Sequence, residues 1–556
     1  MPKLIIDNKE VEFTQGQTVI EAAKASGIEI PHFCWHPGLS VSGNCRICLV
    51  EIEKLPKLAI ACSTTATDGM VVHTKSEKVV SSQKAVMEFL LINHPLDCPI
   101  CDEAGECKLQ DYAFKYSKGE SRFDEEKNHK DKRVSLGPNV MFDQERCISC
   151  SRCIRFCDEV AKEPQLTFVQ RGEKVTIKTF PGKELDNPYS MNVVEICPVG
   201  ALTSKHFRFR SRVWDMSFTD SVCPGCSRGC NTTIGVRQNE ILRIEPRENS
   251  EVNNWWLCDW GRINTIKDIS NEKTRMNLPK IKPEEMSSGE DKLIEVGWEE
   301  AVSKSVSLLT GKKLNVLFLA SPYSTLEDNY TLKKFAGEVF HCKELYYMPD
   351  EDDSFGDNIL RKSDKTPDST GLKALGINPL SETVIKQIHD GKYKALYVIN
   401  DTIERNPELV NLISKFEVKV FHLNKKNKYT WMNADVIFSE SSYAEINGTF
   451  MNFQGRIQRI RPAVATLEQE RLLGEYSLSR LDKFGAHNDR WTKDNRVNAR
   501  PTWKILKQIA MAFGKQFKFE NSEEVFSEMC QTEFGLAGMD YEKIGSAGYL
   551  LKSEKV

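Results

Sequence analysis

The sequence C-I-S-C-S-R-C at residues 147–153 decides how the first half of the chain is interpreted. Three cysteines at this spacing lie on a tight turn and can each bind one corner of a 4Fe–4S cluster. Cys197, which a proline follows, supplies the fourth thiolate. Cys157 follows the motif, but no second group of this kind precedes Cys197. We therefore expect Cys157 to be a buried thiol rather than a ligand.

Cysteines are concentrated between residues 34 and 258, which hold sixteen of the eighteen. Fifteen of these and one histidine form four groups of candidate ligands. We number the groups along the chain: site 1 is Cys34, Cys45, Cys48 and Cys62; site 2 is His94, Cys98, Cys101 and Cys107; site 3 is Cys147, Cys150, Cys153 and Cys197; site 4 is Cys223, Cys226, Cys230 and Cys258. We find no signal peptide, and in a reducing compartment Cys-x-x-Cys pairs favour metal over disulfides.

Site 1 has the pattern of a 2Fe–2S centre, in which a long loop supplies three thiolates and the next strand supplies the fourth. Gly38 and Gly43 let that loop wrap and point its amides at sulfur. Before the loop, residues 3–13 predict a hairpin, and Thr18 to Glu21 is a capping box that opens a helix ended by Gly27. Strands are expected at 48–53, 58–63 and 71–74. The pattern predicts a small α+β sheet, and a structural zinc site is the alternative for its cysteines.

Sites 2 and 4 have less common ligand spacings. A helix predicted at residues 77–92 leads into site 2, where an imidazole in place of a thiolate removes one negative charge and shifts the potential of a cluster. The alternative is a Cys3His zinc site. Strands are predicted at 232–236 and 241–245, between the ligands of site 4, and the alternative there is a zinc ribbon. We prefer iron for site 4 because three other cluster sites precede it.

Residues 273–556 change to alternating strands and helices, which predicts a doubly wound α/β domain. No GxGxxG follows a strand, and no Walker P-loop or Ser/His/Asp group stands out, so we expect no catalytic residues. The strands are predicted at 315–320, 395–399, 418–423 and 434–438, and the helices at 325–340 and 407–416.

Composition narrows the class of protein. The net charge is −3, which gives no basic field for a nucleic-acid partner. No run approaches the roughly 18 apolar residues that a transmembrane segment needs. We therefore expect a soluble chain without a transmembrane segment.

Three motifs together resemble the family of large iron–sulfur subunits (the G-subunit, of 75 kDa type) of respiratory complex I, NADH-quinone oxidoreductase. They are H-P-L-D-C-P-I-C-D-E-A-G-E-C at 94–107, C-I-S-C-S-R-C-I-R-F at 147–156 and I-C-P-V-G-A-L-T-S-K at 196–205. Further on, E-I-N-G-T-F-M-N-F-Q-G-R-I-Q at 445–458 and the sequence from Trp503 to Leu506 resemble the molybdopterin oxidoreductase family.

The resemblance implies a multidomain α+β and α/β protein in five segments. They are a ferredoxin-like (β-grasp) 2Fe–2S domain at 1–78, a His/Cys3 4Fe–4S domain at 79–135, a ferredoxin-type 4Fe–4S domain at 136–215, a molybdopterin-oxidoreductase-type 4Fe–4S domain at 216–272, and a truncated molybdopterin-oxidoreductase-like α/β domain without cofactor at 273–556. A bound pterin is not expected, because the chain ends before the family's last domain and Trp260 stands where many members have a lysine.

The implied function is that of an electron-relay subunit in the peripheral arm of complex I. Single electrons pass from a flavin and NADH-binding subunit through one 2Fe–2S and three 4Fe–4S clusters toward quinone, coupled to proton translocation, with site 4 off the path. The expected partners are the flavin subunit, other iron–sulfur subunits and, indirectly, the membrane arm, on the cytoplasmic side of the bacterial inner membrane. The chain would have no NADH site of its own. Alternatives are a diaphorase-type subunit of an NAD-linked hydrogenase, a formate dehydrogenase, and a zinc-stabilised interaction module.

Overall fold

The computed structural model describes residues 1–117, 119–267, 269, 274–283, 293–310, 314–400, 403–427, 430, 433–468 and 496–551. Its contacts divide the chain into two compact units, Met1–Trp214 and Asp215–Val556, which are described separately. The expected domain boundary between residues 272 and 273 lies outside the described residues, and our division into five segments stays a prediction.

The first unit begins with a five-stranded sheet of strand order β2-β1-β5-β3-β4. Asp7 and Asn8 adopt left-handed φ angles of 49° and 67° and form the two-residue turn of the first hairpin. Thr18 and Glu21 form the capping box of α1 as predicted, and the buried face of α1 packs against the sheet. The elements are β1 (Lys3–Ile6), β2 (Lys9–Glu12), α1 (Val19–Ala25), β3 (Leu49–Ile52), β4 (Ala59–Ile60) and β5 (Val71–His73). The ferredoxin-like fold is confirmed.

The rest of this unit consists of the long helix α2 (Glu77–Ile92) and shorter elements joined by loops, and sites 2 and 3 lie on these loops and on short helical turns that contain Cys98 and Cys153. The predicted helix at 77–92 is present as α2, whose N-cap Ser76 accepts a hydrogen bond from the amide of Val79. The elements are α2 (Glu77–Ile92), α3 (Lys108–Tyr116), β6 (Val134–Ser135), β7 (Val140–Phe142), α4 (Arg152–Arg155), a π-helix (Phe156–Val160), β8 (Leu166–Val169), β9 (Thr176–Thr179), α5 (Asn192–Glu195) and β10 (Leu202–Ser204). Strands β10, β7 and β6 form one sheet, and β8 and β9 form a hairpin.

The second unit starts with an antiparallel sheet that frames site 4. Cys223 directly follows β11, Cys230 directly precedes β12, and Cys258 is the N-cap of α6. The elements are β11 (Ser217–Val222), β12 (Asn231–Arg237), β13 (Glu240–Pro246) and α6 (Asp259–Ile263). The two strands predicted between the ligands of site 4 are therefore present.

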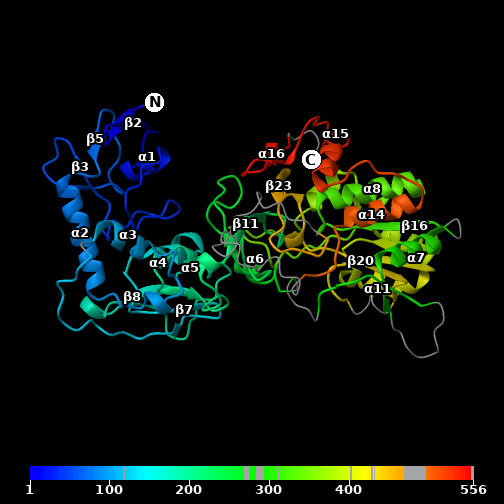
Figure 1. The fold of residues 1–556 in the computed structure, drawn as a ribbon, viewed down its shortest axis with the longest axis horizontal. Coiled ribbons are helices and arrows are strands. Elements are labelled where there is room, and N and C mark those ends of the chain that lie inside the picture. The colour runs from blue at the N-terminus through cyan, green and yellow to red at the C-terminus, as the bar shows by residue number, and fades with distance from the viewer. Residues whose placement is uncertain are drawn as a thin grey trace. The chain divides into compact units, whose positions relative to one another are not determined.

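An eight-stranded sheet of order β15-β14-β21-β20-β19-β16-β17-β18 forms the centre of the second unit (Figure 1). From β21 to β18 all neighbouring strands are parallel. Phe318 and Ala320 pack with residues of α7, α8 and α14, whereas Leu317 and Leu319 pack with residues of α10 and α11. Since successive side chains of β16 enter opposite cores, helices cover both faces, and the doubly wound α/β fold is confirmed.

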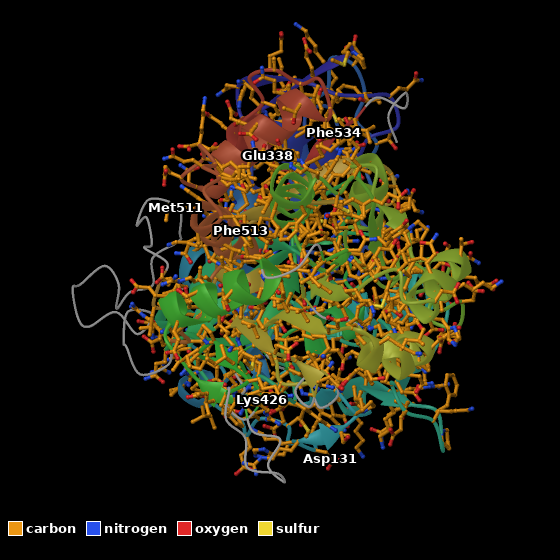
Figure 2. The ribbon with its side chains drawn as sticks, turned by 90° about the vertical axis from the view of Figure 1, so that its right-hand side faces the viewer. Asp131, Glu338, Lys426, Met511, Phe513 and Phe534 are labelled. Atoms are coloured by element: carbon orange, nitrogen blue, oxygen red, sulfur yellow. The ribbon has the colours of Figure 1, made fainter. Side chains whose placement is uncertain are left out.

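The elements of this layer are β14 (Lys280–Ile281), β15 (Ile294–Glu295), α7 (Trp298–Thr310), β16 (Val316–Ala320), α8 (Leu326–Phe340), β17 (Leu345–Tyr347), α9 (Ser369–Ala374), β18 (Asn378–Pro379), α10 (Glu382–His389), β19 (Ala395–Val398), α11 (Pro407–Leu412), β20 (Val418–Leu423) and β21 (Val436–Ser439). The chain ends with β22 (Gly448–Met451), β23 (Arg456–Ile460), α14 (Thr502–Ala512), α15 (Ser522–Thr532), α16 (Tyr541–Ile544) and β24 (Tyr549–Leu550). Figure 2 shows Phe513 and Phe534, which follow α14 and α15, on the same side of the unit as Glu338 of α8. Within the described residues, no helix combines the length and the apolar character that crossing a membrane requires.

Candidate metal centres

Site 1 lies on the loop between α1 and β3 and on the segment after β4. Cys34, Cys48 and Cys62 are buried, and Cys45 is half-buried. Hydrogen bonds from the thiols of Cys45 and Cys62 lower the pKa of Cys34, and the same bonds raise the pKa of both partners. A hydrogen bond also joins Cys48 to Cys62, so the four thiols are in mutual contact. Such a group loses all its protons only when a cation compensates the charges, which a bound metal centre does.

The backbone of site 1 also presents an amide to sulfur, because Cys34 N–H donates to Cys45 Sγ at 3.4 Å. Gly43 adopts a left-handed φ of 65°, and so does Arg46, with φ of 61°. Gly38 differs from the expectation, because its N–H donates to the Nδ1 of His36 at 3.1 Å rather than to sulfur. The imidazole of His36 competes successfully for that amide because a ring nitrogen is a stronger acceptor than a thiol.

Site 3 converges around one small apolar cavity. All four of its cysteines line this cavity, together with hydrophobic side chains that include Phe142 and Leu202. Ser149 and Ser151 adopt left-handed φ angles of 54° and 62°, which turn the chain between the cysteines, and Ser149 N–H donates to Cys147 Sγ at 3.4 Å. Burial raises the pKa of Cys153 and Cys197 well above the usual value for a thiol. The site is therefore a dry, closed nest of thiols, as a buried cluster requires.

Site 2 is nearer the surface. Cys101 and Cys107 are buried, while Cys98 is exposed. The charge of Cys98 acts on Cys101 and that of Cys101 acts on Cys107, whereas the charges that act on His94 are those of Arg146, Lys127 and Asp97. Burial and the positive charge of Arg146 lower the pKa of His94 to about 4. The imidazole is therefore neutral at pH 7, which is the form that binds metals.

Sites 2 and 3 are in direct contact through Gly200, which follows Cys197 by three residues. A Cβ atom at Gly200 would overlap the Sγ of Cys101 and would lie 2.9 Å from the Cβ of Glu103. Only a glycine fits there, so the polypeptide of site 3 touches a candidate ligand of site 2. Gly200 lies in the motif at 196–205, but the sequence does not show its role, which depends on a contact between residues about a hundred positions apart.

Site 4 has four buried cysteines whose charges act on one another. Gly225 N–H donates to Cys223 Sγ and Gly261 N–H donates to Cys258 Sγ, both at 3.4 Å. A Cβ atom at Gly261 would lie 2.8 Å from Cys223 Sγ. Backbone amides thus approach sulfur at site 4 as they do at sites 1 and 3.

The motif at 445–458 supports the loop of site 4. Gln458 donates to the carbonyl of Gly229 at 2.9 Å, and Asn452 donates to the carbonyl of Arg228 at 3.3 Å. The amide of Phe453 donates to the carbonyl of Ser227 at 2.9 Å. The sequence shows the motif but not this role, because more than 200 residues separate it from Cys226 and Cys230.

A cavity of about 640 Å³ lies beside site 4. Pro224, Gly225 and Trp260 line it on the side of the cysteines, and several cationic side chains line it elsewhere. Lys365 Nζ lies 5.2 Å from the centre of a Trp260 ring. Lys426, another lining residue, lies toward the opposite side of the unit from Phe534 in Figure 2. Trp260 thus stands between site 4 and the cavity.

Comparison with known proteins finds a family model for each region of the chain that holds a candidate site. Family models match as follows: a 2Fe-2S iron-sulfur cluster binding domain at 3–77, an NADH-ubiquinone oxidoreductase-G iron-sulfur binding region at 83–122, the ferredoxin-like domain of NADH-quinone oxidoreductase subunit 3 at 137–203, a molybdopterin oxidoreductase Fe4S4 domain at 216–265 and a molybdopterin oxidoreductase model at 363–471. The chain thus contains 2Fe–2S and 4Fe–4S binding domains, and each site lies inside one matched region.

The curated relatives that match are named as subunits of NADH-quinone or NADH-ubiquinone oxidoreductase. The NADH-quinone oxidoreductase G-subunit of Rickettsia conorii is 41% identical over 335 residues, which cover 60% of this chain and 48% of the relative. The G-subunit of Streptomyces coelicolor is 40% identical over 62% of this chain and 40% of the relative. The mitochondrial NADH-ubiquinone oxidoreductase 78 kDa subunit of Candida albicans is 31% identical over 81% of this chain and 57% of the relative.

The chain spans about half the length of the curated relatives it matches. Among solved structures, an NAD+-reducing NiFe hydrogenase in the H2-reduced state matches at 30% identity, with a TM-score of 0.35, over 38% of this chain and 91% of the other. On the combined matches of its iron–sulfur regions, this chain is similar, over the part that they share, to the G-subunits of NADH-quinone oxidoreductase.

Proposed function

We propose that this chain is an electron-relay subunit in the peripheral arm of an NADH-quinone oxidoreductase. It passes single electrons from a flavin and NADH-binding subunit toward quinone, coupled to proton translocation. Its partners are that subunit, other iron–sulfur subunits and, indirectly, the membrane arm, and it lies on the cytoplasmic side of the bacterial inner membrane. The chain performs electron transfer only and has no NADH site or catalytic residue of its own.

The cofactors we propose are a 2Fe–2S cluster at site 1 and 4Fe–4S clusters at sites 2, 3 and 4. All sixteen residues of the four sites, His94 included, serve as ligands. Bound clusters supply one-electron oxidation and reduction without bond changes in the protein. The chain itself buries the sulfur atoms, directs amides at them and fixes the spacing between sites.

The observation that carries this proposal is that site 3 contacts both site 1 and site 2 in the first unit. The guanidinium of Arg155 donates to the carbonyl of Cys34 in site 1 at 2.5 Å, and Arg155 lies two residues after Cys153 in site 3. Gly200, close to Cys197 of site 3, packs on Cys101 of site 2. Three cluster sites in contact suit the stepwise movement of electrons, whereas a zinc-stabilised module needs no such contact.

Metal content tests the proposal directly. The full chain, purified without oxygen, is expected to hold about 14 iron atoms, from one two-iron and three four-iron clusters. Elemental analysis gives the iron and zinc content, and electron paramagnetic resonance of the reduced chain separates the 2Fe–2S signal from the 4Fe–4S signals. Among the described residues, no group of three or more His, Cys, Asp or Glu side chains is arranged to hold a single metal ion. Stoichiometric zinc without visible absorbance would reject the electron-relay function.

The same preparation is expected to contain no molybdenum or tungsten. The indole of Trp260 stands between site 4 and the cavity, where its Cδ1 would lie 3.3 Å from a Cβ at Gly225. The aromatic ring itself provides no ammonium group to connect a cluster with a pterin, and the ammonium of Lys365, which lines the same cavity, lies 5.2 Å from the centre of that ring. Mass spectrometric analysis of both metals checks the expectation, with zinc and iron from the same digest as internal standards. Either metal at one atom per chain would favour a formate-dehydrogenase type of enzyme.

A further inference from the structure

One buried arginine joins the ligand loops of sites 1 and 3. Arg152 lies between the site 3 cysteines Cys150 and Cys153 at the start of α4 and is 4% exposed. Its Nη2 donates to the carbonyl of Trp35 at 2.5 Å, and its Nη1 donates to the carbonyl of Ile196 at 3.1 Å. Trp35 directly follows Cys34 of site 1, and Ile196 directly precedes Cys197 of site 3. A single guanidinium therefore binds the peptide next to a ligand of each site.

Other contacts hold the two loops together around this arginine. The side chain of Asn44, which precedes Cys45, donates to the carbonyl of Ser149 at 3.0 Å. The amide of Ser40 donates to the carboxylate of Glu159 at 2.8 Å. These groups are exposed, whereas the two hydrogen bonds of Arg152 are buried. The hydrogen bond from Arg155 to the carbonyl of Cys34 is partly buried, so the two bonds of Arg152 are the most buried of these contacts between the loops.

Burial disfavours the charge of Arg152, and cysteines of both sites act on it in the opposite direction. The thiolates that act on it belong to two ligands of site 3 and two ligands of site 1, namely Cys150, Cys197, Cys45 and Cys34. A buried cation persists in a protein interior when anions accompany it. Clusters ligated by thiolates are anionic, and each gains one more negative charge on reduction, so a fixed cation between them favours the reduced form of both.

We propose that Arg152 is a positioning residue for electron transfer between site 1 and site 3. Its two hydrogen bonds fix the separation of the ligand loops, and its charge stabilises the added electron on either side. One electron leaves one site and arrives at the other, and no bond or proton changes place. This inference rests on the proposed function, since it requires clusters at both sites.

The test compares Arg152→Gln and Arg152→Lys with the unaltered full chain, loaded with iron and sulfide. Arg171→Gln, which removes an exposed charge from the same unit, is the control for net charge. Redox titration followed by electron paramagnetic resonance gives the midpoint potential of the 2Fe–2S and 4Fe–4S signals. In Arg152→Gln the equilibrium constants for reduction at sites 1 and 3 are expected to fall about tenfold, which is about 59 mV for a one-electron couple. The control is expected to keep both potentials.

Arg152→Lys separates charge from geometry, because an ammonium keeps the charge but lacks the planar fork that binds two carbonyls. Its midpoint potentials are expected to match those of the unaltered chain, while rapid-freeze measurements show slower equilibration between the two signals. Unchanged potentials in a fully loaded Arg152→Gln would overturn the inference. Arg152→Gln can also fail to bind clusters. In that case Arg152→Lys decides, and the inference is overturned if electrons equilibrate between the two signals as fast in Arg152→Lys as in the unaltered chain. Absence of clusters from the unaltered chain rejects the proposed function, which is a different result.

Discussion

Replacing Cys150 by serine is expected to remove the cluster of site 3 and to reduce electron transfer through the assembled complex to background. Cys150 is buried in the thiol nest, and a serine hydroxyl is a poor ligand for iron because it stays protonated at neutral pH. Site 3 contacts both site 1 and site 2, so its loss interrupts the path between them. The expected iron content falls by about four atoms per chain.

Cys157→Ser is the matched control for this change. Cys157 is fully buried in the π-helix that follows α4, and burial raises the pKa of its thiol to about 12. Because both variants place a hydroxyl in a dry environment next to the same helix, their costs to folding are similar. We expect Cys157→Ser to keep the iron content and the rate. Measurements of iron per chain and of NADH-dependent quinone reduction check both variants. If Cys157→Ser loses four iron atoms and Cys150→Ser loses none, then Cys157 is the ligand and Cys150 is the buried thiol.

The sequence was sufficient to predict the elements whose signals are local. The capping box at Thr18, the helix at 77–92 and the strands around β16 depend on neighbouring residues, and all are present. The spacing within each loop also limits which thiols can meet, and the grouping into four ligand sets stays a prediction. These features need no knowledge of how distant segments pack.

The supports of the sites could not be predicted from the sequence, because they depend on packing between distant segments. Arg152 lies inside a cysteine motif, yet its partners are peptide groups at residues 35 and 196. Ser149 and Ser151 are left-handed although serine has no preference for that region, since the turn between ligands imposes it. Motif spacing therefore identifies candidate ligands, and the tertiary structure identifies the residues that hold them in place.

Gly200→Ala is expected to have the second large effect, because it places a methyl group on a candidate ligand of a different site. The new Cβ would overlap Cys101 Sγ and approach Glu103 Cβ to 2.9 Å, so the backbone and Cys101 must move apart. Overpacking of this kind typically costs about 1–3 kcal/mol. The cluster of site 2 tolerates little displacement of a ligand, and we expect the iron content to fall by about four atoms while the 2Fe–2S signal of site 1 persists.

Gly297→Ala is the control, because a Cβ there meets nothing within 4 Å and the residue is not left-handed. Thermal unfolding and iron analysis of both variants, with resonance spectra of the reduced chains, separate a general loss of stability from a local loss of one cluster. A Gly200→Ala chain with full iron content and an unaltered spectrum would show that the loop can move away from Cys101. The contact between sites 2 and 3 would then be too loose to fix the position of either site. In that case the distance between these two sites would have to be fixed by the other elements of the first unit.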